Sequence, residues 1–166
     1  LTLQKEGDLD RYMYLYDTYA GMVEPTAIDV HVGNKETALE TWKKEDQGDY
    51  NDWCYASLEE VKANIVSTGY AAERLIFVVG KVEETIPKTI PGSIALLRLD
   101  TDWYESTYHE LMNLYPLIVK NGVLIVDDYG AWEGSRKAVD QYIEENHLKM
   151  LLTKIGRSGR MAVKSE

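Results

Sequence analysis

The chain has 166 residues, an apolar fraction of 45% and a formal net charge of −10 at pH 7. This size and composition describe one domain, residues 1–166, with a single core. The acidic balance argues against nucleic acid or an anionic membrane as the main partner, because both bind basic surfaces. The single cysteine, Cys54, excludes a disulfide within the chain and fits a reducing cytoplasm. Neither a signal peptide nor a spanning apolar segment is visible, and a start at Leu1 rather than Met suits the later part of a longer protein.

The first predicted elements are a strand and a long irregular segment. Residues 11–18 are a short β-prone run that ends at Asp17, where an acid often hydrogen-bonds a ribose in nucleotide-binding α/β folds. A turn aspartate is the alternative. Residues 19–51 carry several glycines and many charges, and so long a connection is usually functional or partly disordered. We interpret it as a loop that covers the substrate, or alternatively as a solvated insertion anchored to the core by Trp42 and Trp53.

A helix is predicted over residues 57–66. Ser57 can cap its first turn, and Glu60 completes a capping box. Apolar residues recur at helical spacing and should face the core, namely Leu58, Val61 and Ile65. Residues 75–80 then form a predicted buried strand, and residues 80–85 form a loop at its carboxyl end.

The second half alternates strands and helices. Residues 94–99 are an apolar run that indicates a strand buried on both faces of a parallel sheet. Residues 106–120 have helical periodicity, with Pro116 expected to end or kink the helix. Residues 122–126 form another buried strand. The last elements are a helix over residues 135–146 and a hairpin with arms at 150–155 and 160–163. This order predicts a mostly parallel sheet with helices on both faces and an antiparallel finish.

Both strands of the second half end in a pair of acids. Asp100 and Asp102 follow the first strand, and Asp127 and Asp128 follow the second. Ligands bind at the carboxyl edge of open α/β sheets, so the four carboxylates should meet where a ligand would lie. Such a cluster is costly unless a cation or a catalytic task holds it.

The residue types favour a hard cation. Asp100, Asp127 and Asp128 offer only oxygen, which suits Mg²⁺, Ca²⁺ or Mn²⁺ and argues against a structural zinc site. Asp102 lies beyond the strand, where it could reach the same substrate as a general base. The alternative is that acids at strand ends are turn and capping residues. An Asp-x-Asp sequence after an apolar strand also occurs in metal-dependent glycosyltransferases, which is the second enzyme reading.

Several blocks of the sequence resemble the macrocin O-methyltransferase (TylF/MycF-type) family over nearly the whole chain. They are LYDT at 15–18, GKVEETIP at 80–87, IALLRLDTDWYEST at 94–107, HEL at 109–111, LYP at 114–116 and GVLIVDDYG at 122–130, together with Trp132, Gly134, Arg136, Lys137, Ala138, Val139 and Tyr142. The block at 94–107 is the most specific of them.

This resemblance implies a Rossmann-like class I methyltransferase fold, α/β in class, and a function. Family members use S-adenosylmethionine and Mg²⁺ to methylate sugar hydroxyls of natural products. The resemblance implies that the metal is held by Asp100, Asp127 and Asp128, and that Asp102 removes the hydroxyl proton. It also implies, more loosely, a place beside the cofactor for Asp17, Thr18, Gly80, Lys81 and Val82. Trp103 and Tyr104 could form a stacking wall for a sugar, or could equally be core aromatics.

The chain departs from the family in one respect. The family has a first strand and a glycine-bearing loop before the region that matches residues 11–18, and residues 1–10 cannot supply them. That strand lies in the middle of the sheet, so its absence would leave unpaired backbone on two strands. The remaining strands would close up, or another chain would fill the gap, or the chain is a fragment. A non-catalytic remnant that only binds is therefore a third reading, and the oligomeric state stays open, a homo-oligomer included.

Overall fold

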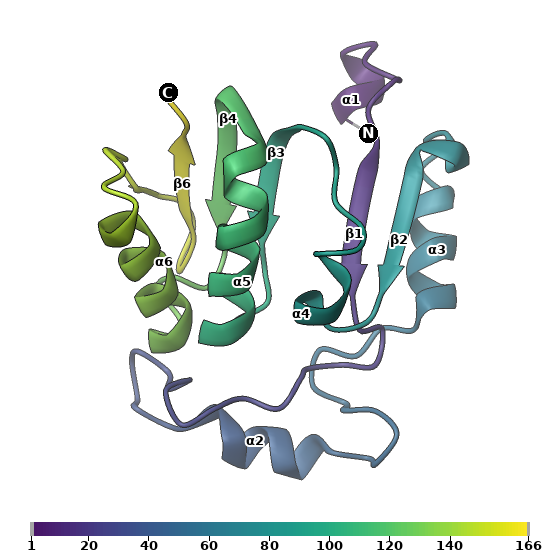
Figure 1. The fold of residues 1–166 in the computed structure, drawn as a ribbon. Helices are drawn as coiled ribbons and strands as arrows, with labels where there is room; N and C mark the ends of the chain where they lie inside the picture. Colours follow the sequence, from purple (N-terminus) through teal and green to yellow (C-terminus); the bar gives the residue numbers. More distant parts are fainter. Residues whose placement is uncertain (1, 166) are drawn as a thin grey trace.

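The computed structural model describes residues 2–165 and arranges their strands in two sheets (Figure 1). In the smaller sheet, β1 (Met13–Asp17) pairs in parallel with β2 (Leu75–Val79). In the larger sheet, β3 (Ile94–Leu99) pairs in parallel with β4 (Ile118–Val126). All four of these strands run in the same direction, so their carboxyl ends lie at one edge of the molecule.

The larger sheet ends in the antiparallel hairpin that the sequence predicts. β6 (Arg160–Val163) runs antiparallel to β4, and the short β5 (Thr153–Lys154) pairs antiparallel with β6. The strand order of the larger sheet is therefore β3-β4-β6-β5. The predicted fold, a mostly parallel Rossmann-like sheet with an antiparallel hairpin, is confirmed.

A gap separates the two sheets between β1 and β3 (Figure 1). Within residues 2–165, no strand pairs with the facing edges of β1 and β3. This is the position at which the family resemblance implies a further strand, and the remaining strands do not close up to fill it. Each facing edge therefore presents backbone N–H and C=O groups that no strand satisfies.

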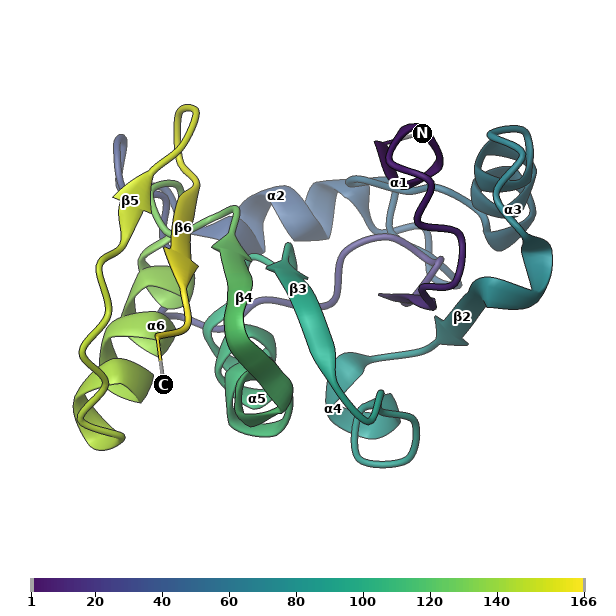
Figure 2. The same ribbon diagram turned by 90° about the horizontal axis from the view of Figure 1, so that it is seen from above.

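Helices lie on both sides of the sheets (Figure 2). The main core lies on the side of α5 (Tyr104–Leu114) and α6 (Glu133–Glu145). These two helices pack against each other under the larger sheet, whereas α3 (Leu58–Val66) lies beside β2 on the opposite side. The core joins the two helices to β3 and β4, and its most buried members include Leu99, Leu111, Leu124, Val126 and Val139.

The opposite face of the larger sheet is not covered, which corrects the prediction that β3 is buried on both faces. Leu97 and Leu124 pair in register and face the helices, each 8% exposed or less. Their neighbours alternate to the other side, where Leu96 is 59% and Val163 is 52% exposed. Leu96, Val123 and Val163 form one apolar row across three strands. The apolar run was interpreted correctly as a strand, but no helix of the described residues covers this face.

Most element boundaries fall close to the predicted ones, with local differences. α5 ends at Leu114 and a 3₁₀ turn, η2 (Tyr115–Leu117), contains Pro116, so β4 begins at Ile118 rather than at residue 122. Ser57 caps α3 by accepting a hydrogen bond from the Glu60 N–H at 3.2 Å, as predicted. Leu58, Val61 and Ile65 are the half-buried residues of α3, as expected for a stripe that faces inward, whereas the other α3 residues are exposed. None of the three is fully buried, because α3 lies at the edge of the smaller sheet.

Four short elements were not predicted from the sequence. They are α1 (Thr2–Lys5), α2 (Ala38–Glu45), the 3₁₀ turn η1 (Ala72–Arg74) and α4 (Val82–Thr85), of which α4 falls inside the predicted loop 80–85. α2 belongs to the long segment between β1 and α3, which passes below the carboxyl edge of the sheets (Figure 1). No helix within residues 2–165 is both long and apolar enough to cross a membrane.

Candidate metal and methyl-transfer site

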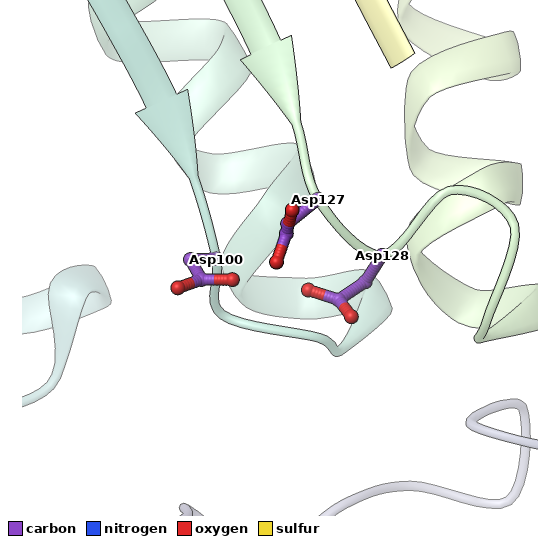
Figure 3. Close-up of side chains that lie close together, drawn as sticks. All are labelled: Asp100, Asp127 and Asp128. Carbon is purple, nitrogen blue, oxygen red and sulfur yellow. The ribbon is translucent and has the colours of Figure 1, made fainter. Parts of the chain in front are cut away.

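The ends of β3 and β4 bring three carboxylates together. Leu99 and Val126 are partners in the parallel register, and the Asp127 N–H donates to the Leu99 carbonyl at 3.0 Å. The two strands therefore end level with each other. Carboxylate oxygens of Asp100, Asp127 and Asp128 all lie within 4.8 Å of one another, as Figure 3 shows. One cation could contact all three.

The electrostatics of this triad also suit a cation. Burial and the neighbouring Asp127 raise the pKa of Asp100 to about 6, against an opposing effect of Arg98. Burial and the charge of Asp127 likewise raise the pKa of Asp128. Among the described residues, Asp128 Oδ2 is buried with no hydrogen-bond partner. A buried carboxylate oxygen without a partner is expensive, and a hard cation is the ligand that such an oxygen prefers.

Arg98 is a member of the site that the sequence reasoning missed. Its Nη1 lies 2.7 Å from Asp100 Oδ2, and its Nη2 lies 3.0 Å from Asp127 Oδ2. Its side chain is 50% exposed, so each ion pair contributes little on its own. The available signal was the spacing: Arg98 precedes Asp100 by two residues, and alternate residues of a strand share a face.

Asp102 lies beside the triad in a strained turn. Its φ of 65° is in the left-handed region, which is uncommon for residues other than glycine. Burial and the charge of Asp128 raise the pKa of Asp102 to about 9, and hydrogen bonding to Trp132 acts in the opposite direction. The fourth carboxylate is thus near the other three without belonging to the 4.8 Å cluster.

Glu110 on α5 is a buried acid close enough to Asp100 for the two charges to interact. Glu110 is 5% exposed and accepts a hydrogen bond from the Thr101 hydroxyl at 2.8 Å. Burial raises its pKa to about 8, and this effect outweighs the hydrogen bond from Thr101. The sequence marked this residue only as part of a family block, since nothing in its helical spacing predicts a carboxyl in the core.

The residues expected near the cofactor gather at the ends of β1 and β2. The Gly80 N–H donates to the Asp17 carbonyl at 2.9 Å, so the two strand ends touch. Asp17 also accepts from the Tyr19 N–H at 2.6 Å, the turn role kept open as its alternative. The Thr18 hydroxyl donates to the Gly21 carbonyl at 2.7 Å. Lys81 precedes α4, and the side chain of Val82 lies in the core.

Trp103 and Tyr104 follow Asp102 and make contacts with different parts of the chain. Trp103 is 2% exposed, and its indole N–H donates to the Val23 carbonyl at 2.9 Å. Its ring meets those of Trp53 and Trp132 edge-on, with centroids 5.6 and 5.0 Å away. Tyr104 stacks on Tyr108 and donates its hydroxyl proton to Gln141 on α6 at 2.8 Å. Trp103 is therefore buried as a core aromatic would be, whereas Tyr104 is half-buried on the surface of α5.

Contacts among Trp53, Trp103 and Trp132 anchor the segment that the sequence suggested as a loop over the substrate. Trp53 comes from this segment and packs on Trp103 and Trp132 of the main domain. Trp42 instead donates to the Met22 carbonyl at 2.8 Å and so ties the segment to itself. Of the two anchors proposed from the sequence, Trp53 reaches the domain and Trp42 does not. The segment is thus attached to the main domain through Trp53, as the alternative of an anchored insertion expects, and the role of a loop over the substrate stays a prediction.

Comparison with known proteins identifies the family. The family model described as Macrocin-O-methyltransferase (TylF) matches residues 1–162. An 8-demethyl-8-(2,3-dimethoxy-alpha-L-rhamnosyl)-tetracenomycin-C 4'-O-methyltransferase of Streptomyces olivaceus is 34% identical over 140 residues, which are 84% of this chain and 50% of that protein. A demethyldecarbamoylnovobiocin O-methyltransferase of Streptomyces niveus is 31% identical over 150 residues, 90% of this chain and 54% of that protein.

A solved structure agrees with the sequence matches. The O-methyltransferase NovP superposes with a TM-score of 0.80 at 29% identity, and the match covers 99% of this chain and 64% of that one. The chain spans about half the length of the curated relatives it matches. Because the family model covers nearly all of its residues, the chain belongs to the macrocin O-methyltransferase (TylF) family.

Proposed function

We propose that this chain forms a Mg²⁺- and S-adenosylmethionine-dependent O-methyltransferase that acts on a sugar hydroxyl of a natural product. The observation that carries the proposal is the triad of Asp100, Asp127 and Asp128 at the carboxyl edge, with Asp102 beside it. Family membership supports methyl transfer. The Streptomyces olivaceus relative is named for 4′-O-methylation of a rhamnosyl-tetracenomycin, which supports a sugar hydroxyl as the acceptor.

The triad fits a small, hard cation. Asp100, Asp127 and Asp128 would hold it through carboxylate oxygens, and the buried Oδ2 of Asp128 gains a partner. When bound, Mg²⁺ supplies a positive charge for the acceptor oxygen, and S-adenosylmethionine supplies the methyl group. The chain's own contribution is to position the acceptor, since much of the rate of such a transfer comes from orientation.

Asp102 would act as the general base. Its carboxyl interacts with Asp128 and Trp132, yet it lies outside the triad and so would not be needed as a metal ligand. Burial raises the pKa of Asp102 to about 9. The ionised carboxylate is therefore a strong base, but most of it is protonated at neutral pH. A positive charge on the triad would lower the pKa of Asp102 toward the working range of a general base.

The ends of β1 and β2 would hold the cofactor. Asp17 is exposed at the tip of β1, and Gly80 has a φ of 130° beside it, a conformation that side chains rarely adopt. An acid and an open backbone at neighbouring strand ends suit a ribose and an adenine, respectively. Lys81 and Thr18 flank this position.

The other two readings make different predictions. A glycosyltransferase would bind a sugar nucleotide, and the comparisons match methyltransferases instead. A non-catalytic remnant would bind Mg²⁺ and lack affinity for S-adenosylmethionine.

Calorimetric titration of S-adenosylmethionine into the purified chain, with and without Mg²⁺, tests the proposal. Micromolar binding, followed by methylation of acceptors such as demethyldecarbamoylnovobiocin, would support it. Mg²⁺ binding with no cofactor binding would contradict it for this chain and favour the remnant.

The metal assignment has a separate test. Asp100→Ala should weaken Mg²⁺ binding by at least about tenfold, because loss of even an outer partner of a metal site costs that much. Asp49→Asn, a change of an exposed acid between β1 and α3, serves as the control. Unchanged Mg²⁺ affinity in Asp100→Ala would remove Asp100 from the ligand set.

A further inference from the structure

We propose that Asp29 is a positioning residue whose buried carboxylate joins the cover segment, residues 19–56, to the starts of α5 and α6 and so holds Asp102 in place. The inference rests on the proposed function of Asp102 and adds a residue that acts through it. Asp29 belongs to no block of the family resemblance and lies 73 residues before Asp102 in the sequence.

The first step of the argument is the burial of Asp29. Its exposed fraction is 0%, the lowest of any acid in the described chain. Its Oδ2 accepts hydrogen bonds from the Thr26 N–H at 2.8 Å and from the Thr26 hydroxyl at 2.9 Å. Its Oδ1 accepts from the Tyr104 N–H at 2.9 Å. Removing a carboxylate from water is costly, so a buried one that serves only to fill space would be a poor choice.

The second step is the position of this carboxylate at two helix ends. Tyr104 is the first residue of α5, whose own N-cap residue, Trp103, makes no capping hydrogen bond with its side chain. Asp29 supplies that cap from another part of the chain. Gly134 lies in the first turn of α6, and a Cβ built there would meet Asp29 Oδ1 at 2.0 Å. The carboxylate therefore lies where the partial positive charges of two helix N-termini meet.

The third step links Asp29 to Asp102. Asp102 precedes Tyr104 by two residues, and its left-handed φ of 65° persists only when its surroundings fix it. On one side the Trp103 N–H donates to the Thr101 carbonyl at 2.7 Å, which closes the turn. On the other side Asp29 fixes the Tyr104 N–H. The turn that carries Asp102 is thus held at both ends.

Residues 29–32 also contact the segment around Trp132, which hydrogen-bonds Asp102. The Val30 carbonyl accepts from the Glu133 N–H at 2.9 Å, and the Val32 N–H donates to the Ala131 carbonyl at 2.8 Å. These bonds bracket Trp132, whose ring meets His31 edge-on at 5.4 Å. Trp132 in turn contacts Trp103 and faces Asp102. Residues 29–32 therefore set both neighbours of the proposed base.

The experiment compares Asp29→Asn and Asp29→Ala with Asp49→Asn, which makes the same charge change at an exposed site of the cover segment. An asparagine at residue 29 must direct its NH₂ group at either Thr26 or Tyr104, so one of the present hydrogen bonds becomes a donor–donor clash. We expect kcat for methyl transfer to fall about a hundredfold, as for a catalytic group displaced by about 1 Å. Mg²⁺ affinity should stay within about twofold, because the triad stands on strand ends that Asp29 does not touch.

Two readouts distinguish positioning from general stability. In the double variant with Asp102→Asn, the losses in kcat should not multiply, because Asp29 acts through a group already removed. In ¹⁵N-labelled protein, the indole N–H signal of Trp132, assigned with Trp132→Phe, should move or broaden in Asp29→Asn. The indole signal of Trp42, which bonds within the cover segment, should not. Multiplying losses, or an unmoved Trp132 signal in folded Asp29→Asn and Asp29→Ala, would overturn the inference. An inactive wild-type chain would contradict the proposed function, and the indole signals would still test the role of Asp29.

Discussion

The two sheets of the molecule differ in how completely they are built. The larger sheet carries the triad and packs α5 and α6 on a continuous core. The smaller sheet carries the residues expected near the cofactor, and no residue of β1 is fully buried. The larger sheet, or metal half, therefore rests on a core within the chain, whereas the strand β1 of the smaller sheet, or cofactor half, is at most half-buried. We infer that metal binding and cofactor binding can be separated in this chain.

The gap between the sheets sharpens this contrast. β4 has partners on both sides, β3 and β6, whereas β3 and β1 each have one. The β3 edge and the β1 edge that face the gap therefore both lack strand partners among residues 2–165, as do the outer edges of β2 and β5. The proposed base and the triad follow β3 and β4 on one side of the gap, and Asp17 and Gly80 lie at the ends of β1 and β2 on the other.

The largest expected effect belongs to the metal half. Asp102→Asn should lower turnover by about 10²–10⁴-fold, the usual contribution of a general base, while Mg²⁺ affinity stays near normal. The wild-type rate should rise with pH as Asp102 loses its proton, and this rise should vanish in the variant. Single-turnover methyl transfer over a pH series, with Mg²⁺ calorimetry alongside, provides the measurement. Loss of Mg²⁺ binding in Asp102→Asn would instead make Asp102 a ligand.

A matched pair of leucines compares the stability of the two halves. Leu99→Ala removes a side chain that is 2% exposed and should cost about 2–5 kcal/mol. Leu15→Ala, at the half-buried centre of β1, should cost about 1 kcal/mol. Urea unfolding followed by far-UV circular dichroism measures both. Equal costs would show that β1 is as well supported as β3, for instance because another polypeptide occupies the gap.

The sequence predicted the elements that depend on local pattern and the site that depends on topology. Apolar runs located β2, β3 and the end of β4, and Ser57 marked the start of α3. Asp100 and Asp127 could be placed together because parallel neighbouring strands end at the same edge. That inference needs only the order of strands and helices, which the sequence pattern supplies.

Features that depend on contacts distant in sequence were not predictable. The prediction that β3 is buried on both faces failed because an apolar run records what a strand can bury, not whether a helix covers it. Trp53 was expected to anchor its segment, but its partners, Trp103 and Trp132, could not be named because the rings meet only after the segment folds back. The bond from Asp29 to Tyr104 spans 75 residues and is equally invisible in any window of sequence.

The smallest expected effect concerns Glu110, whose buried carboxyl lies in the metal half. Its pKa is raised to about 8 in the folded chain, above the value of about 4.3 for an unfolded glutamate. The folded state therefore holds this proton more tightly, and the stability that Glu110 contributes is lost as pH rises from about 4.3 through 8.

Glu110→Gln keeps an acceptor for the Thr101 hydroxyl and removes the ionisation. We expect the variant to be more stable than the wild type at pH 8 by about 1 kcal/mol or more, since one pKa unit corresponds to about 1.4 kcal/mol. At pH 4 the two should be nearly equal. Urea unfolding at both pH values measures the difference, and an equal gap at the two pH values would mean that Glu110 is ionised without cost in the folded chain. A further comparison at pH 8 with saturating Mg²⁺ extends the test, because positive charge near Asp100 would favour the ionised Glu110 and shrink the advantage of the variant.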